Sequence, residues 1–126
     1  MMDSFRLDPR SARSELHRRL GERAPARIQL FAGPRQVGKT TLLLSLAEDL
    51  GPRAIYAAAD GPEALLPGFW EGLWARAGQA AATHGQVALL IDEIQQVPDW
   101  AARLKGDWDR LRRTRLAVNV VVSGSS

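Results

Sequence analysis

Apolar residues follow two alternating patterns along this chain. Short runs that are apolar at every position or at alternate positions predict strands, and they occupy residues 27–32, 54–58, 87–91 and 116–122. Between these runs, apolar residues return every three or four positions and predict helices over residues 10–21, from 39 to the Gly51-Pro52 break, from 69 to 84 and from about 99 to 113. Proline and glycine at close intervals in residues 60–67 predict turns.

Strands that alternate with helices predict an α/β fold on a mostly parallel sheet with right-handed crossovers. The run at 87–91 supports this fold class, because a strand without a polar position is typically covered by helices on both faces. A chain of 126 residues allows one domain with one hydrophobic core.

The composition narrows the possible chemistry. The chain has no cysteine, which excludes a disulfide scaffold, a thiolate zinc site and thiol catalysis. His17 and His84 lie far apart in the sequence and lack the spacing of a metal site. The apolar runs are too short to span a membrane, and the first residues lack the apolar stretch of a signal peptide. We therefore expect a cytoplasmic protein without membrane contact.

Positive charge is concentrated in one segment. The net charge is +3, and residues 103–115 hold six Arg or Lys against only Asp107 and Asp109. This segment is either a patch for nucleic acid or an acidic partner, or a solvated helix end whose cations offset the helix dipole. We favour the helix end, which is the commoner role of such a charge run.

The tryptophan pairs Trp70/Trp74 and Trp100/Trp108 present a similar choice. They could stack on nucleic-acid bases, or they could cover the sheet from the apolar faces of two helices. Aromatic residues at helical spacing are more often core residues, and we favour core packing.

Residues 33–40 fit the pattern G-x-x-x-x-G-K-[ST] without an exception, between a predicted strand and a predicted helix. Glycines let the backbone curl around a phosphate, and the start of the helix adds unpaired N–H groups. Lys39 would reach the β- and γ-phosphates, and the Thr40 hydroxyl would bind magnesium. The candidate nucleotide-binding residues are Gly33, Pro34, Arg35, Gln36, Val37, Gly38, Lys39, Thr40 and Thr41.

The alternative for this segment is an ordinary glycine-rich turn between a strand and a helix. With the glycine, lysine, serine and threonine content of this chain, the motif would arise by chance about once in a thousand such sequences. We therefore predict a phosphate-binding loop.

Two acidic residues follow the apolar run at 87–91. Asp92 and Glu93 would lie at the carboxyl edge of a parallel sheet, where such folds bind their ligands. Asp92 would hold magnesium, usually through water, and Glu93 would act as the general base on an attacking water. An Asp-Glu pair often only starts a turn, but its combination with a phosphate-binding loop favours the catalytic interpretation.

The last predicted strand is followed by Ser123-Gly124-Ser125-Ser126. If this strand lies between the first and third strands, its end points at the γ-phosphate, and Ser123 would contact the phosphate or the water as a sensor. The alternative is a frayed terminus. Ser123 joins Glu93 and Lys39 as a candidate catalytic residue.

Three segments together resemble one protein family. They are GPRQVGKTTLL from Gly33, LLIDEIQQVPDW from Leu89 and the final VVVSGSS. Their order and gaps are similar to those in the P-loop domain of a prokaryotic group of AAA-type ATPases, and the resemblance covers about residues 10–126.

The resemblance implies a three-layer P-loop core with the strand order 5-1-4-3-2. It implies phosphate and magnesium roles for Lys39 and Thr40, a Walker B role for Asp92 and Glu93, and a sensor role for Ser123. Positions that match the group without a chemical role that we can assign are Asp60, Gln95 and Trp100.

Relatives continue beyond the sensor strand with an arginine finger, a fifth strand and further elements that this sequence lacks. We therefore expect an N-terminal helix and lead-in over residues 1–26 and a partial nucleotide-binding domain over residues 27–126, with strand order 1-4-3-2. The first strand should then be a sheet edge. Because Arg112, Arg113 and Arg115 precede the sensor strand, a finger worth about 10³–10⁵ in rate would come from a protein partner or a second copy.

These observations predict a chain that binds ATP or ADP with Mg²⁺ and hydrolyses ATP slowly. Two alternatives stay open. The chain could hold nucleotide without useful hydrolysis, or it could be a small basic adaptor that binds nucleic acid through residues 103–115 and the tryptophans.

Overall fold

The computed structural model of this chain describes residues 2–5, 13–15, 18, 28–33 and 38–125. Its strands are β1 (Met2–Phe5), β2 (Ile28–Gly33), β3 (Ala54–Ala58), β4 (Val87–Asp92) and β5 (Val118–Ser125). Its α-helices are α2 (Lys39–Leu50), α3 (Phe69–His84) and α4 (Trp100–Thr114). Short 3₁₀ helices are η2 (Gly51–Arg53), η3 (Pro62–Leu65) and η4 (Ile94–Gln96).

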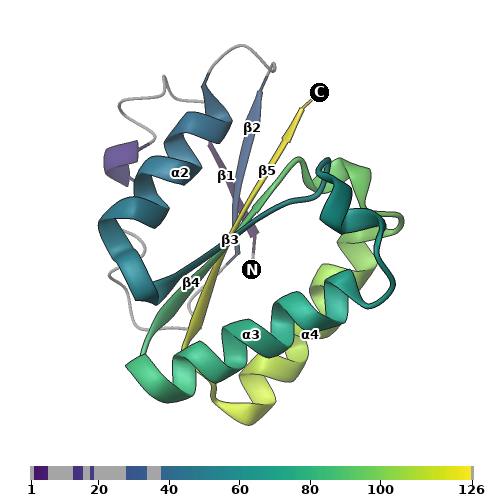
Figure 1. Ribbon diagram of the computed structural model, residues 1–126. Coiled ribbons are helices and arrows are strands. Elements are labelled where there is room, and N and C mark those ends of the chain that lie inside the picture. Colours follow the sequence, from purple (N-terminus) through teal and green to yellow (C-terminus); the bar gives the residue numbers. More distant parts are fainter. Residues whose placement is uncertain (1, 6–12, 16–17, 19–27, 34–37, 126) are drawn as a thin grey trace.

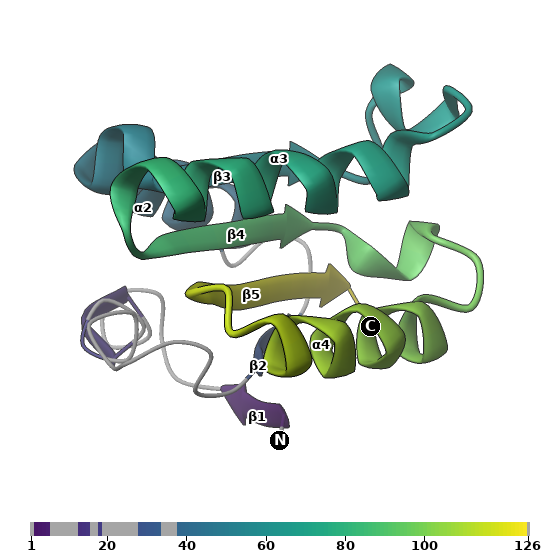
Figure 2. The same ribbon diagram turned by 90° about the horizontal axis from the view of Figure 1, so that it is seen from below.

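The strands form one parallel sheet in the order β1-β2-β5-β4-β3. The part β2-β5-β4-β3 is the predicted 1-4-3-2 order, so the α/β class and the strand order are confirmed. Figure 1 shows α2 on one side of the sheet and α3 with α4 on the other. In Figure 2, α3 runs along β4 and α4 lies beside β5.

The expectation that the first predicted strand forms a sheet edge is wrong. β1 pairs in parallel with β2, in a register that runs from Met2 opposite Ile28 to Phe5 opposite Phe31. β1 therefore forms hydrogen bonds with backbone groups that β2 would otherwise leave unpaired. β1, rather than β2, is the edge strand of the sheet. Its sequence MDSF shows no apolar alternation, so its strand conformation depends on pairing with β2 rather than on its own pattern.

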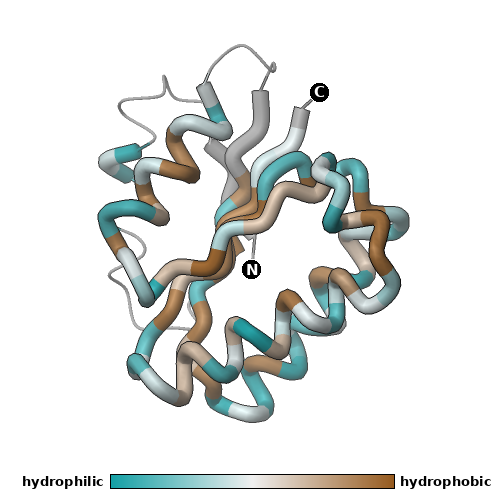
Figure 3. Tube along the Cα trace, viewed as in Figure 1, coloured by the Kyte–Doolittle hydropathy of each residue, from teal (hydrophilic) through white to brown (hydrophobic). Residues whose placement is uncertain are grey.

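Alternate residues of the central strands pack into two cores. In β4, Leu89 and Ile91 pack with α3 and α4, whereas Ala88 and Leu90 pack with α2. Every residue of β4 is buried, as expected for a parallel strand that is covered on both faces. Figure 3 shows hydrophobic residues along the central strands and at intervals along the helices.

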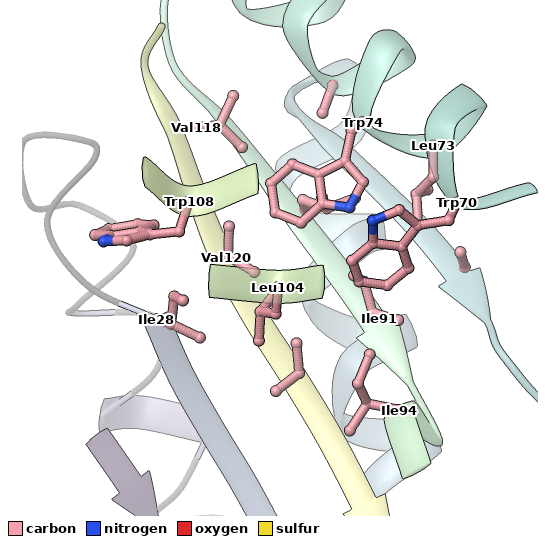
Figure 4. Close-up of a cluster of buried hydrophobic side chains, with 14 of the residues drawn as sticks. Ile28, Trp70, Leu73, Trp74, Ile91, Ile94, Leu104, Trp108, Val118 and Val120 are labelled. Carbon is pink, nitrogen blue, oxygen red and sulfur yellow. The ribbon is translucent and has the colours of Figure 1, made fainter. Parts of the chain in front are cut away.

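The tryptophans belong to the core on the α3 and α4 side. Trp70, Trp74 and Trp108 are buried, and the half-buried Trp100 packs against the same cluster. Figure 4 shows three of these indole rings among aliphatic side chains such as Ile91. Core packing is therefore confirmed, and the alternative of exposed base-stacking platforms is wrong for the three buried rings.

Most of the predicted elements are present in the structure. The predicted second strand and third helix coincide with β3 and α3, and β4 and β5 extend past their predicted ends to Asp92 and Ser125. Of the helix predicted over 10–21, residues 13–15 and 18 are described and helical, and the rest lies outside the described residues. The division of the chain at residue 27 stays a prediction. None of the helices in the described segments is long and apolar enough to cross a membrane.

Because all strands are parallel, their carboxyl ends meet at one edge of the sheet. β2 ends there at Gly33, β4 at Asp92 and β5 at Ser125, and α2 begins at Lys39 after the loop that follows β2. Ligands bind at this edge in open α/β sheets. The fold thus gathers the candidate residues in the expected place.

Candidate nucleotide-binding site

The segment between β2 and α2 carries the predicted phosphate-binding motif. Gly33 ends β2, and Gly38 immediately precedes the first residue of α2. Gly38 has a φ of +74°, a left-handed conformation that residues with a side chain adopt only under strain. The backbone therefore requires the second glycine of the motif. Residues 34–37, the middle of the motif, lie outside the described residues.

The motif lysine is buried at the sheet edge. Lys39 is only 2% exposed, and its Nζ donates a hydrogen bond to the carbonyl oxygen of Gly124 in β5 at 2.6 Å. Thr41, two residues further, is exposed in the first turn of α2. The ammonium group has three N–H donors, so its position at the end of β5 suits binding of phosphate oxygens.

The two predicted magnesium residues are in direct contact. Thr40 Oγ1 donates a hydrogen bond to Asp92 Oδ2 at 2.6 Å, across 52 positions of sequence. Asp92 is buried at the end of β4, and Thr40 is exposed at the start of α2. A hydroxyl oxygen and a carboxylate oxygen therefore meet at the surface of the sheet edge, and these are ligand types that magnesium prefers.

The Asp92 carboxylate accepts hydrogen bonds from two more hydroxyl groups. Tyr56 of β3 donates to Oδ2 at 2.9 Å, and Ser123 of β5 donates to Oδ1. With Thr40, hydroxyls from one helix and two strands contact this carboxylate. Hydrogen bonds to an ionised acceptor are strong, so these donors fix the orientation of Asp92.

The environment of Tyr56 raises its pKa well above the ordinary value of 10.0. Burial is the largest cause, because it disfavours the charged phenolate. The hydrogen bond to Asp92 and the negative charges of Asp92, Asp60 and Glu93 act in the same direction. Tyr56 therefore stays a neutral hydrogen-bond donor to Asp92 at physiological pH.

No motif in the sequence singles out Tyr56, although the alternation of residues along the strands contains a signal for it. Ala88, Leu90 and Asp92 share one face of β4, since residues two apart in a strand point to the same side. Tyr56 lies opposite Leu90 on the neighbouring strand and packs with the same cluster. A long side chain at this position reaches the residue two places further along the next strand, which is Asp92.

Ser123 lies inside β5 and is fully buried, so the frayed-terminus alternative is wrong for this residue. Its hydroxyl oxygen accepts a hydrogen bond from the backbone N–H of Glu93 at 3.3 Å, while the hydroxyl donates to Asp92. Ser123 thus connects β5 to both acidic residues. Its predicted contact with a phosphate or a water stays a prediction.

Glu93 follows β4 in a left-handed backbone conformation, with φ 54° and ψ 48°. Such a conformation is uncommon for residues other than glycine, and it clusters at functional sites. The carboxylate Oε2 accepts a hydrogen bond from Gln95 Nε2 at 2.6 Å. The candidate general base is therefore held by a residue to which we assigned no role from the sequence.

The basic segment of α4 is interspersed with acidic partners. Ion pairs join Arg103 to Glu71 at 3.4 Å, Lys105 to Asp109 at 3.1 Å, and Arg110 to Asp107. The last turn of α4 carries further arginines, where cations interact favourably with the helix dipole. These contacts support the interpretation of a solvated helix end, and binding of nucleic acid stays an untested alternative.

A hollow of about 830 Å³ is lined by η3, the start of α3 and the segment between η4 and α4. Asp60 and the exposed Leu65 and Leu66 line it. None of the phosphate or magnesium candidates is among its described lining residues.

Comparison with known proteins agrees with this geometry. A family model for an AAA domain matches residues 25–126, which include β2 to β5 and all the candidate residues described above. A search of curated proteins gives no match. Since the match covers most of the chain, the protein belongs to the AAA domain family of P-loop ATPases.

Proposed function

We propose that this chain binds ATP or ADP together with Mg²⁺ at the carboxyl edge of its sheet, and that it hydrolyses ATP slowly. The observation that carries the proposal is the 2.6 Å contact between Thr40 Oγ1 and Asp92 Oδ2. This contact joins the end of the phosphate-binding motif to the acidic end of β4. The proposed chemistry needs both of these groups at one place.

The donor atoms at this contact fit a magnesium ion. Thr40 and Asp92 supply hard oxygen atoms, and Mg²⁺ is typically held by few protein oxygens together with waters and phosphate oxygens. Thr40 would hold the ion directly, and Asp92 would hold it through water. A bound Mg²⁺ would neutralise the charge that develops on the phosphate oxygens.

Lys39 would bind the β- and γ-phosphates. In the structure its Nζ donates to the Gly124 carbonyl, a neutral acceptor at 2.6 Å. A phosphate oxygen carries a negative charge and is a stronger acceptor for an ammonium group. Nucleotide binding would therefore add or exchange a hydrogen bond at a lysine that is already in place at the end of β5.

Glu93 would accept the proton from the water that attacks the γ-phosphate. Its carboxylate is buried next to Asp92, in the first position after β4. Ser123 supports this arrangement, because it contacts the Glu93 backbone and the Asp92 side chain at once. A positioned general base contributes about 10²–10⁴ in rate.

We expect slow turnover from the isolated chain, on the order of 10⁻⁴ to 10⁻² per second, as for NTPases without an added arginine finger. The arginines at the end of α4, Arg112, Arg113 and Arg115, lie before the amino end of β5, whereas the candidate site lies at its carboxyl end. A protein partner or a second copy of the chain would supply the missing positive charge.

Nucleotide binding and phosphate release, measured on the same samples, test the proposal. Lys39→Ala should weaken binding of a fluorescent ATP analogue about 10- to 100-fold, because hydrogen bonds to charged groups contribute about 1.5–3 kcal/mol. Lys105→Ala is the matched control, since it removes an exposed lysine on α4 and should leave binding unchanged. Unchanged affinity of Lys39→Ala would contradict nucleotide binding at this site.

Glu93→Gln separates hydrolysis from binding alone. It should keep ATP affinity and reduce phosphate release to background, while Glu63→Gln in η3, an exposed control with the same chemical change, should have no effect. Phosphate release already at background in the parent, and unaltered in Glu93→Gln, would favour the alternative of a nucleotide-binding module without useful hydrolysis.

A further inference from the structure

We infer that Gln95 is the positioning residue of Glu93: its side-chain amide fixes the carboxylate that is to accept the proton of the attacking water. The inference rests on the proposed ATP hydrolysis. Gln95 would act only through Glu93, so its effect should vanish when the Glu93 carboxylate is absent.

The contact between the two side chains is short and charge-assisted. Gln95 Nε2 lies 2.6 Å from Glu93 Oε2, and Glu93 is buried. Hydrogen bonds to an ionised acceptor are roughly twice as strong as neutral ones, and exclusion of water strengthens them further. A glutamate has several side-chain torsions, and a hydrogen bond of this kind restricts them to one orientation.

The backbone brings the two residues together. The left-handed backbone conformation of Glu93 changes the direction of the chain after β4, and η4 begins at the next residue. The turn is closed by hydrogen bonds from the Gln96 N–H to the Glu93 carbonyl at 3.1 Å and from the Val97 N–H to the Ile94 carbonyl at 3.0 Å. The Gln95 side chain is thereby directed back toward the carboxylate two residues earlier.

The other end of the Gln95 amide packs against β5. A Cβ atom on Gly124 would lie 3.2 Å from Gln95 Oε1 and 3.5 Å from a methyl carbon of Ile94, so the amide lies directly over this glycine. The same Gly124 accepts the hydrogen bond from Lys39. The amide therefore bridges Glu93 and the strand residue that contacts the phosphate-binding lysine.

Steady-state ATP hydrolysis measures the role of this amide. Gln95→Ala should lower kcat about tenfold with little change in KM, because a misplaced general base loses part of its contribution of about 10²–10⁴. Gln96→Ala is the matched control, since it makes the same chemical change at the next, exposed position. Equal kcat values for the two variants would overturn the inference.

Gly124→Ala tests the same contact without altering either side chain. The new Cβ would press on the flexible Gln95 amide and displace it by a few tenths of an ångström, while the backbone of β5 tolerates alanine. We expect a fall in kcat that is smaller than that of Gln95→Ala. A double variant of both positions should be no slower than Gln95→Ala alone, and an additive loss would contradict a shared mechanism.

A further measurement separates this inference from the proposed function. The side-chain amide NMR signal of Gln95, assigned by its absence in Gln95→Ala, should shift in Glu93→Ala without any turnover. An unshifted signal would overturn the positioning role, whereas a shifted signal with no hydrolysis in the parent would refute only the proposed ATPase activity.

Discussion

Side chains from distant parts of the chain converge on a single carboxylate, that of Asp92. Its oxygens accept hydrogen bonds from Thr40, Tyr56 and Ser123, each of which belongs to a different element. The pairing of Thr40 with Asp92 could be predicted, because the motifs that contain them have a chemical reason to meet. The contribution of Tyr56 could not be predicted by motif, since it arises from the register of β3 on β4.

The role of Gln95 could not be predicted from the sequence for a different reason. Its contact with Glu93 depends on the left-handed conformation at Glu93, and nothing in the residue types of a DEIQ segment specifies that turn. Motifs in the sequence therefore identify the residues that a known chemistry requires. They do not identify the residues that hold those side chains in place.

Tyr56 is the only tyrosine of the chain, so its ionisation can be followed directly by ultraviolet absorption of the phenolate. In metal-free buffer, the folded protein should show no phenolate signal until well above pH 10.0, because burial and Asp92 raise its pKa. Asp92→Asn should shift the titration back toward the ordinary value, and a urea-unfolded sample should titrate near it. Titration of the folded parent at pH 10.0 would contradict the environment described for Tyr56.

The raised pKa of Tyr56 also lowers the stability of the folded protein at high pH. Above pH 10.0 the unfolded chain loses the Tyr56 proton while the folded chain retains it, so the unfolded state is favoured as the pH rises through this window. Tyr56→Phe removes this contribution. Its free energy of unfolding, relative to the parent, should therefore improve between pH 9 and 11, which chemical denaturation at several pH values would measure.

At the scale of elements, periodicity predicts the helices and central strands well. The bounds of β3 and α3 coincide with their predicted ranges, because apolar residues on a strand or an amphipathic helix must repeat at fixed intervals. The exception is β1, whose four residues carry no such repeat. The strand conformation of β1 depends on its pairing with β2. The pattern of residues in a single sequence does not reveal that pairing.

Helices α3 and α4 are joined by polar contacts as well as by apolar packing. The Trp70 indole N–H donates to Asp107 Oδ2 at 2.5 Å, and Arg103 lies 5.2 Å from the centre of the Trp70 ring. Asp107→Ala should lower the free energy of unfolding by about 1–3 kcal/mol, since it leaves a buried N–H without its acceptor. Urea denaturation followed by tryptophan fluorescence would measure this change.

Asp109→Ala provides the comparison for this experiment. Asp109 lies two residues away on the same helix, and its side chain is 38% exposed, compared with 14% for Asp107. It forms a surface ion pair with Lys105, and such pairs contribute about 0–1 kcal/mol. Equal destabilisation by the two substitutions would show that the buried indole contact is not what stabilises the helix pair.

At the scale of the whole molecule, the strand order places a different partner on each side of β2. β1 covers one side and β5 the other, so β2 is protected from pairing with another molecule. A variant without residues 2–5 should expose β2 as an edge. We expect a lower melting temperature and concentration-dependent self-association, measured by sedimentation velocity.

Replacement of residues 2–5 by four threonines tests whether backbone pairing is responsible. Threonine favours strands and leaves the backbone groups of β1 available, so this variant should behave like the parent. ADP binding should persist in both variants, because the candidate site is built from elements on the other side of β2. A monomeric deletion variant with unchanged stability would refute a protective role of β1.

The central position of β5 also determines the order in which this molecule can fold. Before residues 118–125 join, the sheet consists of two separate pairs, β1 with β2 and β4 with β3, and isolated two-stranded units are only marginally stable. One pair leads into Lys39 and Thr40, and the other carries Asp92 and Glu93. A ribosome releases the chain from its N-terminus, so a nascent chain would gain affinity for nucleotide only after β5 emerges and inserts between the two pairs. Nucleotide binding would thus report the insertion of β5 into the sheet during synthesis.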